Sequence, residues 1–405
     1  MKSKARDVSL GIVTSIGGFL EIGSIATSAQ AGAGYGYQLA WSVVLGTICI
    51  TFLVEMCGRF AACSGQTIPD AMRERFGANF FAITTAIFLA VSLIVLAAEM
   101  GGIAAALEMA TNVPIPIWAI LVALLAWALL WRGTFSFIEN GVSLLGLVTL
   151  AFVVAAVKLH PSYHQLVVAF LPSRPTHDRA HYWFVAVSVL GATITPSLYF
   201  FYSSGVVEDK WDETYVGANR IISVIGMGFG GFLSIAVLVL GAIVYYPRHI
   251  DVEHYQQLPT LLTGAFGHAG FWLFLVCLGI ACLGATLEFA LALAYTLAQG
   301  LGWTWTEDST PHENARFSLT YTLCIAAAAI FVLVGLDPIQ LTQIGMALTA
   351  ASLPIGVFPF LILMNDPDYL GTHTNSHIGN VVVMVISALA AVLAVVTIPL
   401  QIAGS

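Results

Sequence analysis

Five glutamates lie inside long apolar stretches of this 405-residue chain: Glu21, Glu55, Glu99, Glu108 and Glu288. An ionised carboxylate at the centre of a membrane helix costs about 2.5–3.5 kcal/mol on insertion scales, so each of them needs a physical reason. Such groups bind cations, carry protons or pair with a neighbouring charge. The residues around each glutamate indicate which of these uses applies.

Glu21 stands in the glycine-rich segment 17–24, Gly-Gly-Phe-Leu-Glu-Ile-Gly-Ser. Glycine weakens a helix, so we expect Gly18 and Gly23 to break this first apolar stretch near its middle. An unwound turn inside a bilayer survives only where it lines a cavity or packs against protein. A break frees backbone carbonyls, here near Leu20, and a carboxylate beside freed carbonyls is typical of a cation site. The alternative is a tight helix crossing with a protonated Glu21.

A second apolar stretch is interrupted at residues 191–197, Gly-Ala-Thr-Ile-Thr-Pro-Ser. Pro196 removes a helix hydrogen bond, so a break is expected there. Two broken helices, five spans apart, indicate a transporter of inverted repeats with its site at the membrane midplane. The pattern predicts repeat one at about 8–158, repeat two at about 182–364 and an extra helix at about 377–402.

The other glutamates divide into two groups. Arg59 follows Glu55 by four residues, so an ion pair on one helix face accounts for Glu55. Glu108 lies near the outer end of its stretch, where water reaches it. Glu99 and Glu288 sit deeper without a local partner. They carry protons, or they are protonated and hydrogen-bonded; the sequence leaves both readings open.

Lipid must be the solvent for most of the chain, because 59% of its residues are apolar and 9% are charged, against roughly 25% charged in soluble domains. Eleven apolar windows are long enough to cross a membrane. They cover residues 8–33, 38–64, 77–110, 115–133, 138–158, 182–206, 219–246, 257–300, 316–335, 338–364 and 377–402. The third and eighth are long enough to tilt or project into water. We predict an all-α integral membrane protein with a single domain, 1–405.

Several function classes are excluded or disfavoured. The chain has no basic tract, which argues against a nucleic-acid partner. Its six cysteines form no CxxC pair and are expected to be small core residues. The first apolar run lacks a signal-peptide cleavage site. No nucleophile–base pair, phosphate loop or HExxH-type motif is present, so we expect neither an enzyme nor a cofactor.

The distribution of Lys and Arg predicts the orientation. With the N-terminus in the cytoplasm, that side carries ten of these residues and the opposite side four. The N-terminus is therefore expected inside, and eleven spans place the C-terminus outside. The expected location is a bacterial inner membrane, with the lipid bilayer as a partner. The oligomeric state is left open, and a monomer is compatible with the sequence.

The chain resembles the Nramp divalent-metal transporters over nearly its whole length. The matching segments, in the family's order, are Glu21–Thr27 with Gln30–Ala33, Ser64–Gln66 with Arg73–Gly77, Gly191–Ser204, and Leu336–Pro338 through Leu353–Pro354 and Pro359. The resemblance implies a LeuT-like fold of five plus five helices, with an eleventh added and helices one and six broken. It also implies a divalent cation as the transported substrate.

The chain departs from the family at the signature positions. The family's Asp-Pro-Gly-Asn aligns with Glu21–Ser24, and its Met-Pro-His aligns with Thr195–Ser197. A second family histidine falls on Tyr202. The family's glutamine on the tenth helix aligns loosely with Met346, with Gln343 one turn away. Glu99 matches one of the family's proton-conducting acidic residues.

These departures imply a cation site made of oxygen atoms. Its donors would be the Glu21 carboxylate, the hydroxyls of Ser24, Thr195 and Ser197, carbonyls near Leu20 and Thr193, and Gln343. Without the methionine, selectivity should shift from soft transition metals toward Mg²⁺ or a similar hard cation. Without the histidines, tight proton coupling is not expected. Glu99, Tyr202 and Glu288 are candidates for moving protons or for supporting the metal ligands.

A second hypothesis keeps the fold and changes the substrate. LeuT-like scaffolds also carry amino acids, amines and other small organic solutes. Here Phe19, Tyr199, Phe200 and Tyr202 would hold the solute, with Glu21 facing an ammonium group. A third hypothesis is a non-transporting sensor or scaffold, against which the lack of an attached soluble signalling domain argues.

Overall fold

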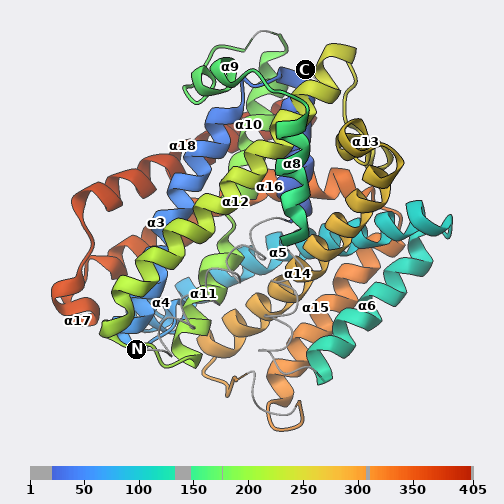
Figure 1. The fold of residues 1–405 in the computed structure, drawn as a ribbon. Helices are drawn as coiled ribbons and strands as arrows, with labels where there is room; N and C mark the ends of the chain where they lie inside the picture. Colours follow the sequence, from blue (N-terminus) through green and yellow to red (C-terminus); the bar gives the residue numbers. More distant parts are fainter. Residues whose placement is uncertain (1–20, 133–146, 176, 307–310, 403–405) are drawn as a thin grey trace.

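The computed structural model describes residues 21–132, 147–175, 177–306 and 311–402, and in these ranges the regular elements are helices (Figure 1). The α-helices are α2 (Ile22–Tyr35), α3 (Ala40–Ser64), α4 (Ile68–Phe76), α5 (Ala78–Thr111), α6 (Ile115–Arg132), α8 (Leu150–Lys158), α9 (Tyr163–Val168), α10 (Arg179–Thr193), α11 (Pro196–Glu208), α12 (Val216–Val244), α13 (Thr260–Phe266), α14 (His268–Gly300), α15 (Ala315–Leu333), α16 (Pro338–Met364), α17 (Pro367–Leu370) and α18 (His377–Ile402).

Nine spans among the described residues are long and apolar enough to cross a membrane, with α10 and α11 together forming one of them. The others are built on α3, α5, α6, α12, α14, α15, α16 and α18. The remaining two predicted spans, 8–33 and 138–158, extend beyond the described ranges, and α2 and α8 are their described parts. Within these limits, the structure agrees with the predicted spans.

The connecting segments gather at two opposite ends of the bundle. The short helices α9 and α13 lie at one end, and α4 and α17 lie toward the other (Figure 1). An ion pair between Arg75 and Asp366, 3.3 Å apart, holds α4 to the segment before α17. The sequence of α4 explains its short length, because Thr67 caps its N-terminus and Gly77, at φ +85°, ends it.

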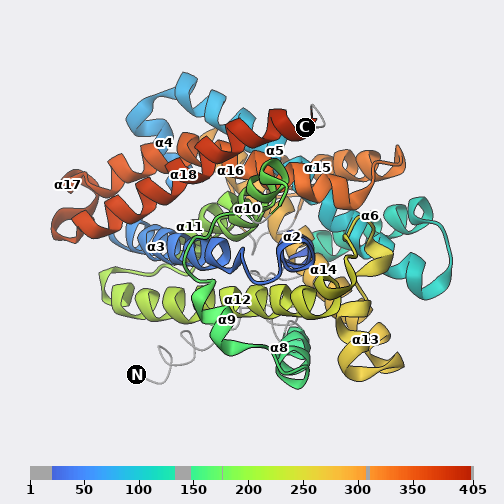
Figure 2. The same ribbon diagram turned by 90° about the horizontal axis from the view of Figure 1, so that it is seen from above.

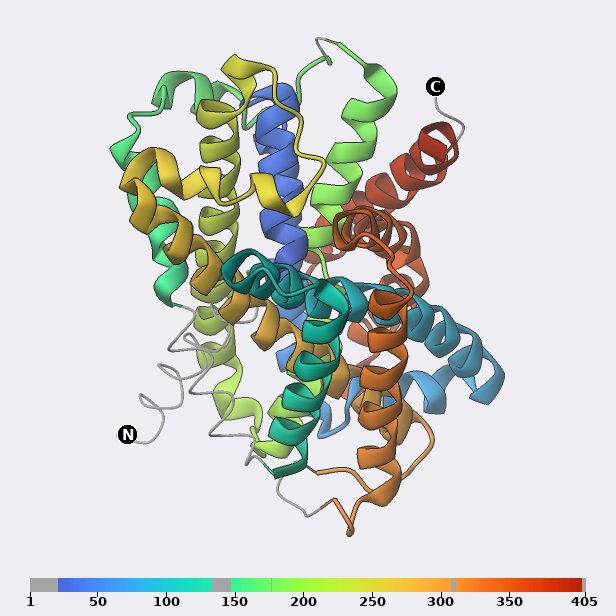
Figure 3. The same cartoon turned by 90° about the vertical axis from the view of Figure 1, so that its right-hand side faces the viewer.

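The two longest predicted windows differ in the structure. Helix α5 is 34 residues long and crosses the bundle obliquely, as predicted (Figures 1 and 3). The eighth window, predicted as a single helix, is instead two helices. Gly267 adopts φ +62° between α13 and α14, a conformation that suits glycine and that a continuing helix does not allow.

Helix α2 lies at the centre of the bundle, between α10 and α12 (Figure 2). Glycines permit this close packing: a Cβ on Gly32 would stand 2.2 Å from the carbonyl oxygen of Leu238 on α12. The outer helices α6 and α18 instead expose apolar side chains, such as Leu124 and Val392. An apolar outer surface around a packed interior is what a lipid solvent requires, so the chain is an integral membrane protein.

Candidate functional site

Helix α2 begins in the middle of the bundle, and this start, called the first break below, is the described part of the first predicted break. Glu21 has an extended backbone (φ −117°, ψ 174°), and its carbonyl accepts the N–H of Ile25 at 3.0 Å to begin the helix. The N–H of Ile22 donates to Oε2 of Glu99 on α5 at 3.2 Å. A carboxylate is favourable here because the first helical N–H groups lack partners and carry the positive end of the dipole.

The second break separates α10 from α11. Helix α10 ends at Thr193, and Ile194 and Thr195 leave the helical conformation before α11 begins at Pro196. Proline suits the first position of a helix, where no N–H is needed. The carbonyl of Ala192 accepts the hydroxyl of Thr195 at 3.2 Å and lies 3.5 Å from the hydroxyl of Ser24. Carbonyls at a helix C-terminus carry partial negative charge, which favours a cation.

The two breaks meet at Glu21 and Thr195. Thr195 Oγ1 lies 3.4 Å from Glu21 Oε1, and the two residues are 9% and 3% exposed. A hydroxyl has one proton, so Thr195 donates to Glu21 or to Ala192 and not to both. Ser197, on the first turn of α11, is buried, and its hydroxyl has no partner among the described residues. The junction therefore holds a carboxylate and several oxygens with unused lone pairs.

A thioether lies at the same junction. A Cβ on Gly23 would stand 2.2 Å from Cε and 2.9 Å from Sδ of Met346, and 3.2 Å from Oε1 of Glu21. The side chain of Met346, a fully buried residue of α16, thus lies close to both Gly23 and the Glu21 carboxylate. The sequence places Met346 at the family's glutamine position and Gln343 one turn away, and the predicted ligand role of Gln343 stays a prediction. The soft sulfur of Met346 is the chemical signal at this position.

One predicted position needs correction. Gly23 lies inside the first turn of α2, so the backbone departs from the helix at Glu21 instead. The missing Cβ of Gly23 makes room for Met346. The hydroxyl of Thr193 donates to the carbonyl of Val189 within α10, and the carbonyl of Ala192, one residue earlier, accepts the hydroxyl of Thr195. The predicted ligand role of the Thr193 carbonyl stays a prediction. The predicted break at Gly18 and the carbonyl of Leu20 lie outside the described residues, as does Phe19.

Tyr202 on α11 contacts α3 and α12. Its hydroxyl donates to Asn219 Oδ1 on α12 at 2.9 Å, and its ring packs against Gly58 of α3. Tyr202 therefore joins α11 to α3 and α12, and its predicted role in moving protons or supporting the metal ligands stays a prediction. Glu288 lies on α14. Oε1 of Glu99 has no hydrogen-bond partner among the described residues.

Glu55 and Arg59 form the predicted ion pair, with Nε and Oε1 3.0 Å apart. The same guanidinium donates to the carbonyl of His373 and to Asn375, so it also holds the segment between α17 and α18. Glu108, near the end of α5, accepts the N–H of Ile115 at 3.3 Å. The ion pair predicted for Glu55 is confirmed, and Glu108 lies near the end of its helix, as predicted. The six cysteines are free thiols, as expected.

The α13 end of the site is covered by the segment between α12 and α13. Gln30 of α2 donates to the carbonyl of Val252 at 3.0 Å. The buried Tyr255 lies in the same segment, and its hydroxyl is 3.1 Å from that of Thr342 on α16. These contacts join the segment to two helices that carry site residues.

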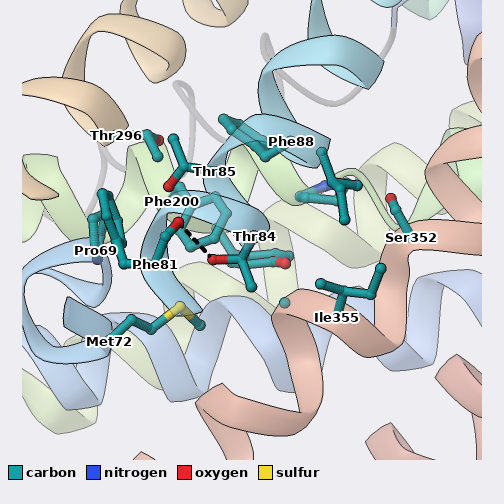
Figure 4. Close-up of a pocket in the computed structure, with 14 residues that line it drawn as sticks. Pro69, Met72, Phe81, Thr84, Thr85, Phe88, Phe200, Thr296, Ser352 and Ile355 are labelled. Atoms are coloured by element: carbon teal, nitrogen blue, oxygen red, sulfur yellow. Dashed lines mark hydrogen bonds between the residues drawn. The ribbon is translucent and has the colours of Figure 1, made fainter. Parts of the chain in front are cut away.

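On the other side of the junction, a cavity of about 30 Å³ reaches Pro196 (Figure 4). It is lined mainly by α5 and α11, including Phe81, Phe88 and Phe200. A volume of this size holds one or two water molecules. Tyr199 also lines it and stacks on Phe360, at 6.4 Å between ring centroids. These aromatic rings pack against neighbouring helices rather than around Glu21.

The fold and the paired breaks define a class, the membrane transporters with a LeuT-like fold. The structure of MhsT in complex with L-phenylalanine superposes with a TM-score of 0.63 at 14% identity, covering 96% of this chain and 97% of MhsT. A variant of the manganese transporter of Eremococcus coleocola superposes with a TM-score of 0.80 at 20% identity, covering 98% of this chain and 87% of that one. The predicted LeuT-like fold is confirmed.

Within that class, the chain belongs to the Nramp family. The model of the family described as natural resistance-associated macrophage protein-like matches residues 11–399. The divalent metal cation transporter MntH of Erwinia tasmaniensis is 26% identical over 390 residues, which cover 92% of this chain and 90% of MntH. Members of this family are transporters and not enzymes.

Proposed function

We propose that this protein carries a divalent metal cation across a membrane by alternating access, with the cation as substrate. The observation that carries the proposal is the approach of Glu21 Oε1 to Thr195 Oγ1, 3.4 Å apart, at the point where two broken helices meet. A fixed negative charge beside helix-end carbonyls suits a cation. The names of the MntH and manganese-transporter relatives point to the same class of substrate.

The proposed ligands are the carboxylate of Glu21, the hydroxyls of Ser24, Thr195 and Ser197, and the carbonyl of Ala192. Within the described ranges, no three His, Cys, Asp or Glu side chains gather as metal ligands usually do. The cation must therefore take neutral oxygens beside its carboxylate. Taken alone, these oxygen donors favour Mg²⁺ or a similarly hard cation.

Transport without tight proton coupling is part of the proposal. All ten histidines lie in connecting segments or in the first turns of helices, away from the junction. No imidazole is therefore placed to exchange protons with the cation near neutral pH. Uptake into proteoliposomes should be nearly the same with and without an imposed pH gradient. A severalfold stimulation by an inward proton gradient would contradict this part of the proposal.

The repeats and the orientation are also proposed. We assign repeat one to about 8–158, repeat two to about 182–364 and the extra helix to about 377–402. The N-terminus is placed in the cytoplasm and the C-terminus outside, in a bacterial inner membrane. Helices α3 and α6 end, and α15 begins, toward the α4 end of the molecule (Figure 1). Arg59, Arg132 and Arg316 therefore lie toward the end proposed to face the cytoplasm.

The direct test is cation uptake by the purified full-length protein in proteoliposomes, with Mg²⁺, Mn²⁺, Ca²⁺ and Cd²⁺ supplied separately. At least one ion should enter, and Glu21→Gln should abolish its uptake while the protein remains monodisperse. Glu55→Gln removes a carboxylate that is already paired and serves as the control. If none of the four ions moves, or if the Glu21 variant transports like the unaltered protein, the proposal is wrong.

A further inference from the structure

The thioether of Met346 lies close to Gly23 and Glu21, at the start of α2. A Cβ on Gly23 would stand 2.2 Å from the methyl carbon of Met346, 2.9 Å from its Sδ and 3.2 Å from Glu21 Oε1. Sulfur and carboxylate oxygen are thus neighbours across one small gap. Met346 is fully buried, and it belongs to α16, a helix that contributes none of the oxygen donors.

The backbone around Met346 is held tightly in place. A Cβ on Gly191 of α10 would stand 1.8 Å from the Met346 carbonyl oxygen and 3.2 Å from the N of Ala350. Gly191 immediately precedes Ala192, whose carbonyl accepts the Thr195 hydroxyl. Gly191 therefore lets the backbone of α16 approach the second break, and Gly23 lets the side chain of Met346 approach the first. The sulfur is positioned by the same contacts that build the junction.

Packing accounts for the methyl group of Met346, which fills the space beside Gly23, and the sulfur adds a second capacity. A thioether has no proton to donate and is only a weak acceptor, so it gives nothing to a carboxylate oxygen beside it. A bound metal ion would change this, because carboxylate and sulfur can both donate electron pairs to it. An apolar side chain such as leucine would fill the same space without that capacity.

We propose that Met346 is a metal ligand, and that its sulfur makes the site prefer soft and borderline transition metals to Mg²⁺ and Ca²⁺. Thioethers favour such metals, whereas the hard cations take oxygen ligands. This inference rests on the proposed function and revises the selectivity that oxygen donors alone would give. Thr195 offers no sulfur atom at the second break, and Met346 of α16 supplies one instead.

The test compares Met346→Leu with Met364→Leu in the full-length protein. Both residues are buried methionines of α16, but Met364 is the last residue of the helix, far from the junction. Isothermal titration with Cd²⁺, Mn²⁺ and Mg²⁺ gives the affinities. Met346→Leu should weaken Cd²⁺ binding about tenfold or more and leave Mg²⁺ binding within about twofold. Met364→Leu should leave all three affinities unchanged.

X-ray absorption at the cadmium edge gives a second measurement. The Cd²⁺-loaded protein and Met364→Leu should show a sulfur neighbour that Met346→Leu lacks. If Met346→Leu does not fold, Met346→Gln replaces it, and it should lower the preference for Cd²⁺ over Mg²⁺ in the same way, because an amide oxygen is a hard donor.

The outcomes separate the two proposals. If Glu21→Gln abolishes metal binding while the Met346 variants keep the Cd²⁺ preference of the unaltered protein, Met346 is a packing residue and the proposed function stands. If the unaltered protein binds Mg²⁺ more tightly than Cd²⁺, the inference about sulfur is also overturned. If it binds no divalent metal, both proposals fail together.

Discussion

The two helix breaks differ in what they bring to the junction. The first brings charge: Glu21 stands before α2, and a second carboxylate, that of Glu99, accepts the first N–H of the helix. The second break brings neutral groups, namely the hydroxyls of Thr195 and Ser197 and the carbonyl of Ala192. The first break should therefore determine whether a cation binds, and the second how well a given cation fits.

Removing the charge of the first break should have the largest effect. We expect Glu21→Gln to weaken divalent-metal binding about 100-fold or more, because the neutral donors cannot replace a formal charge. Glu21→Asp keeps the charge and should retain most of the affinity. Titration of metal into both purified variants measures this. Equal losses in the two variants would mean that shape, and not charge, is what Glu21 contributes.

The carboxylate behind the first break should have a smaller effect, mainly on stability. Glu99→Gln keeps an oxygen acceptor for the Ile22 N–H but replaces an ionisable group, which can complement the helix dipole, with one that cannot ionise. We expect about 1 kcal/mol lower stability, measured as a lower thermal midpoint in detergent. Metal affinity should fall less than for Glu21→Gln. Glu108→Gln, in the last turn of the same helix, is the matched control and should leave metal binding unchanged.

The second break should respond more weakly. Thr195→Val preserves the shape of the side chain and removes its hydroxyl, so we expect a loss of metal affinity of about three- to tenfold, in line with one hydrogen-bonding group. Thr195→Ser keeps the hydroxyl and should bind nearly as well as the unaltered protein. A loss as large as that of Glu21→Gln would remove the distinction between the two breaks.

The smallest effect is expected at Ser197, and it should differ with and without metal. Its buried hydroxyl has no partner among the described residues, so Ser197→Ala should leave the thermal midpoint of the metal-free protein unchanged or higher. The stabilisation gained on adding metal should become slightly smaller. Thermal melts with and without saturating metal test this, and a clear destabilisation without metal would show that the hydroxyl serves the fold.

Local sequence chemistry predicted the second break and the described spans, and it predicted a break close to Glu21, although not at Gly23. Glycines around Glu21, and Thr195-Pro196, are signals that act over a few residues, as is the spacing of Glu55 and Arg59. The approach of Met346 to Gly23, and the hydrogen bond between Glu99 and the first N–H of α2, could not be predicted in this way. The Glu99 cap joins residues 77 positions apart, and the approach of Met346 depends on how three helices pack.

The contacts of Tyr202 have the same origin. Alignment with a family histidine placed Tyr202 on α11, but it could not fix the direction of the side chain. A hydrogen bond to Asn219 directs the Tyr202 hydroxyl toward α12. Alignment did place Thr195 where its hydroxyl reaches Glu21. A family pattern can therefore predict a position in the chain, whereas the contacts of the side chain depend on how the helices pack.

The burial of Glu21 has a kinetic consequence. A cation cannot reach a carboxylate that is 3% exposed by diffusion alone, because the protein must open first. At high metal concentration the observed association rate should therefore reach a plateau equal to the opening rate. The dissociation rate of the ion is limited by the same opening. Binding kinetics on this protein therefore also measure the rate of its conformational change.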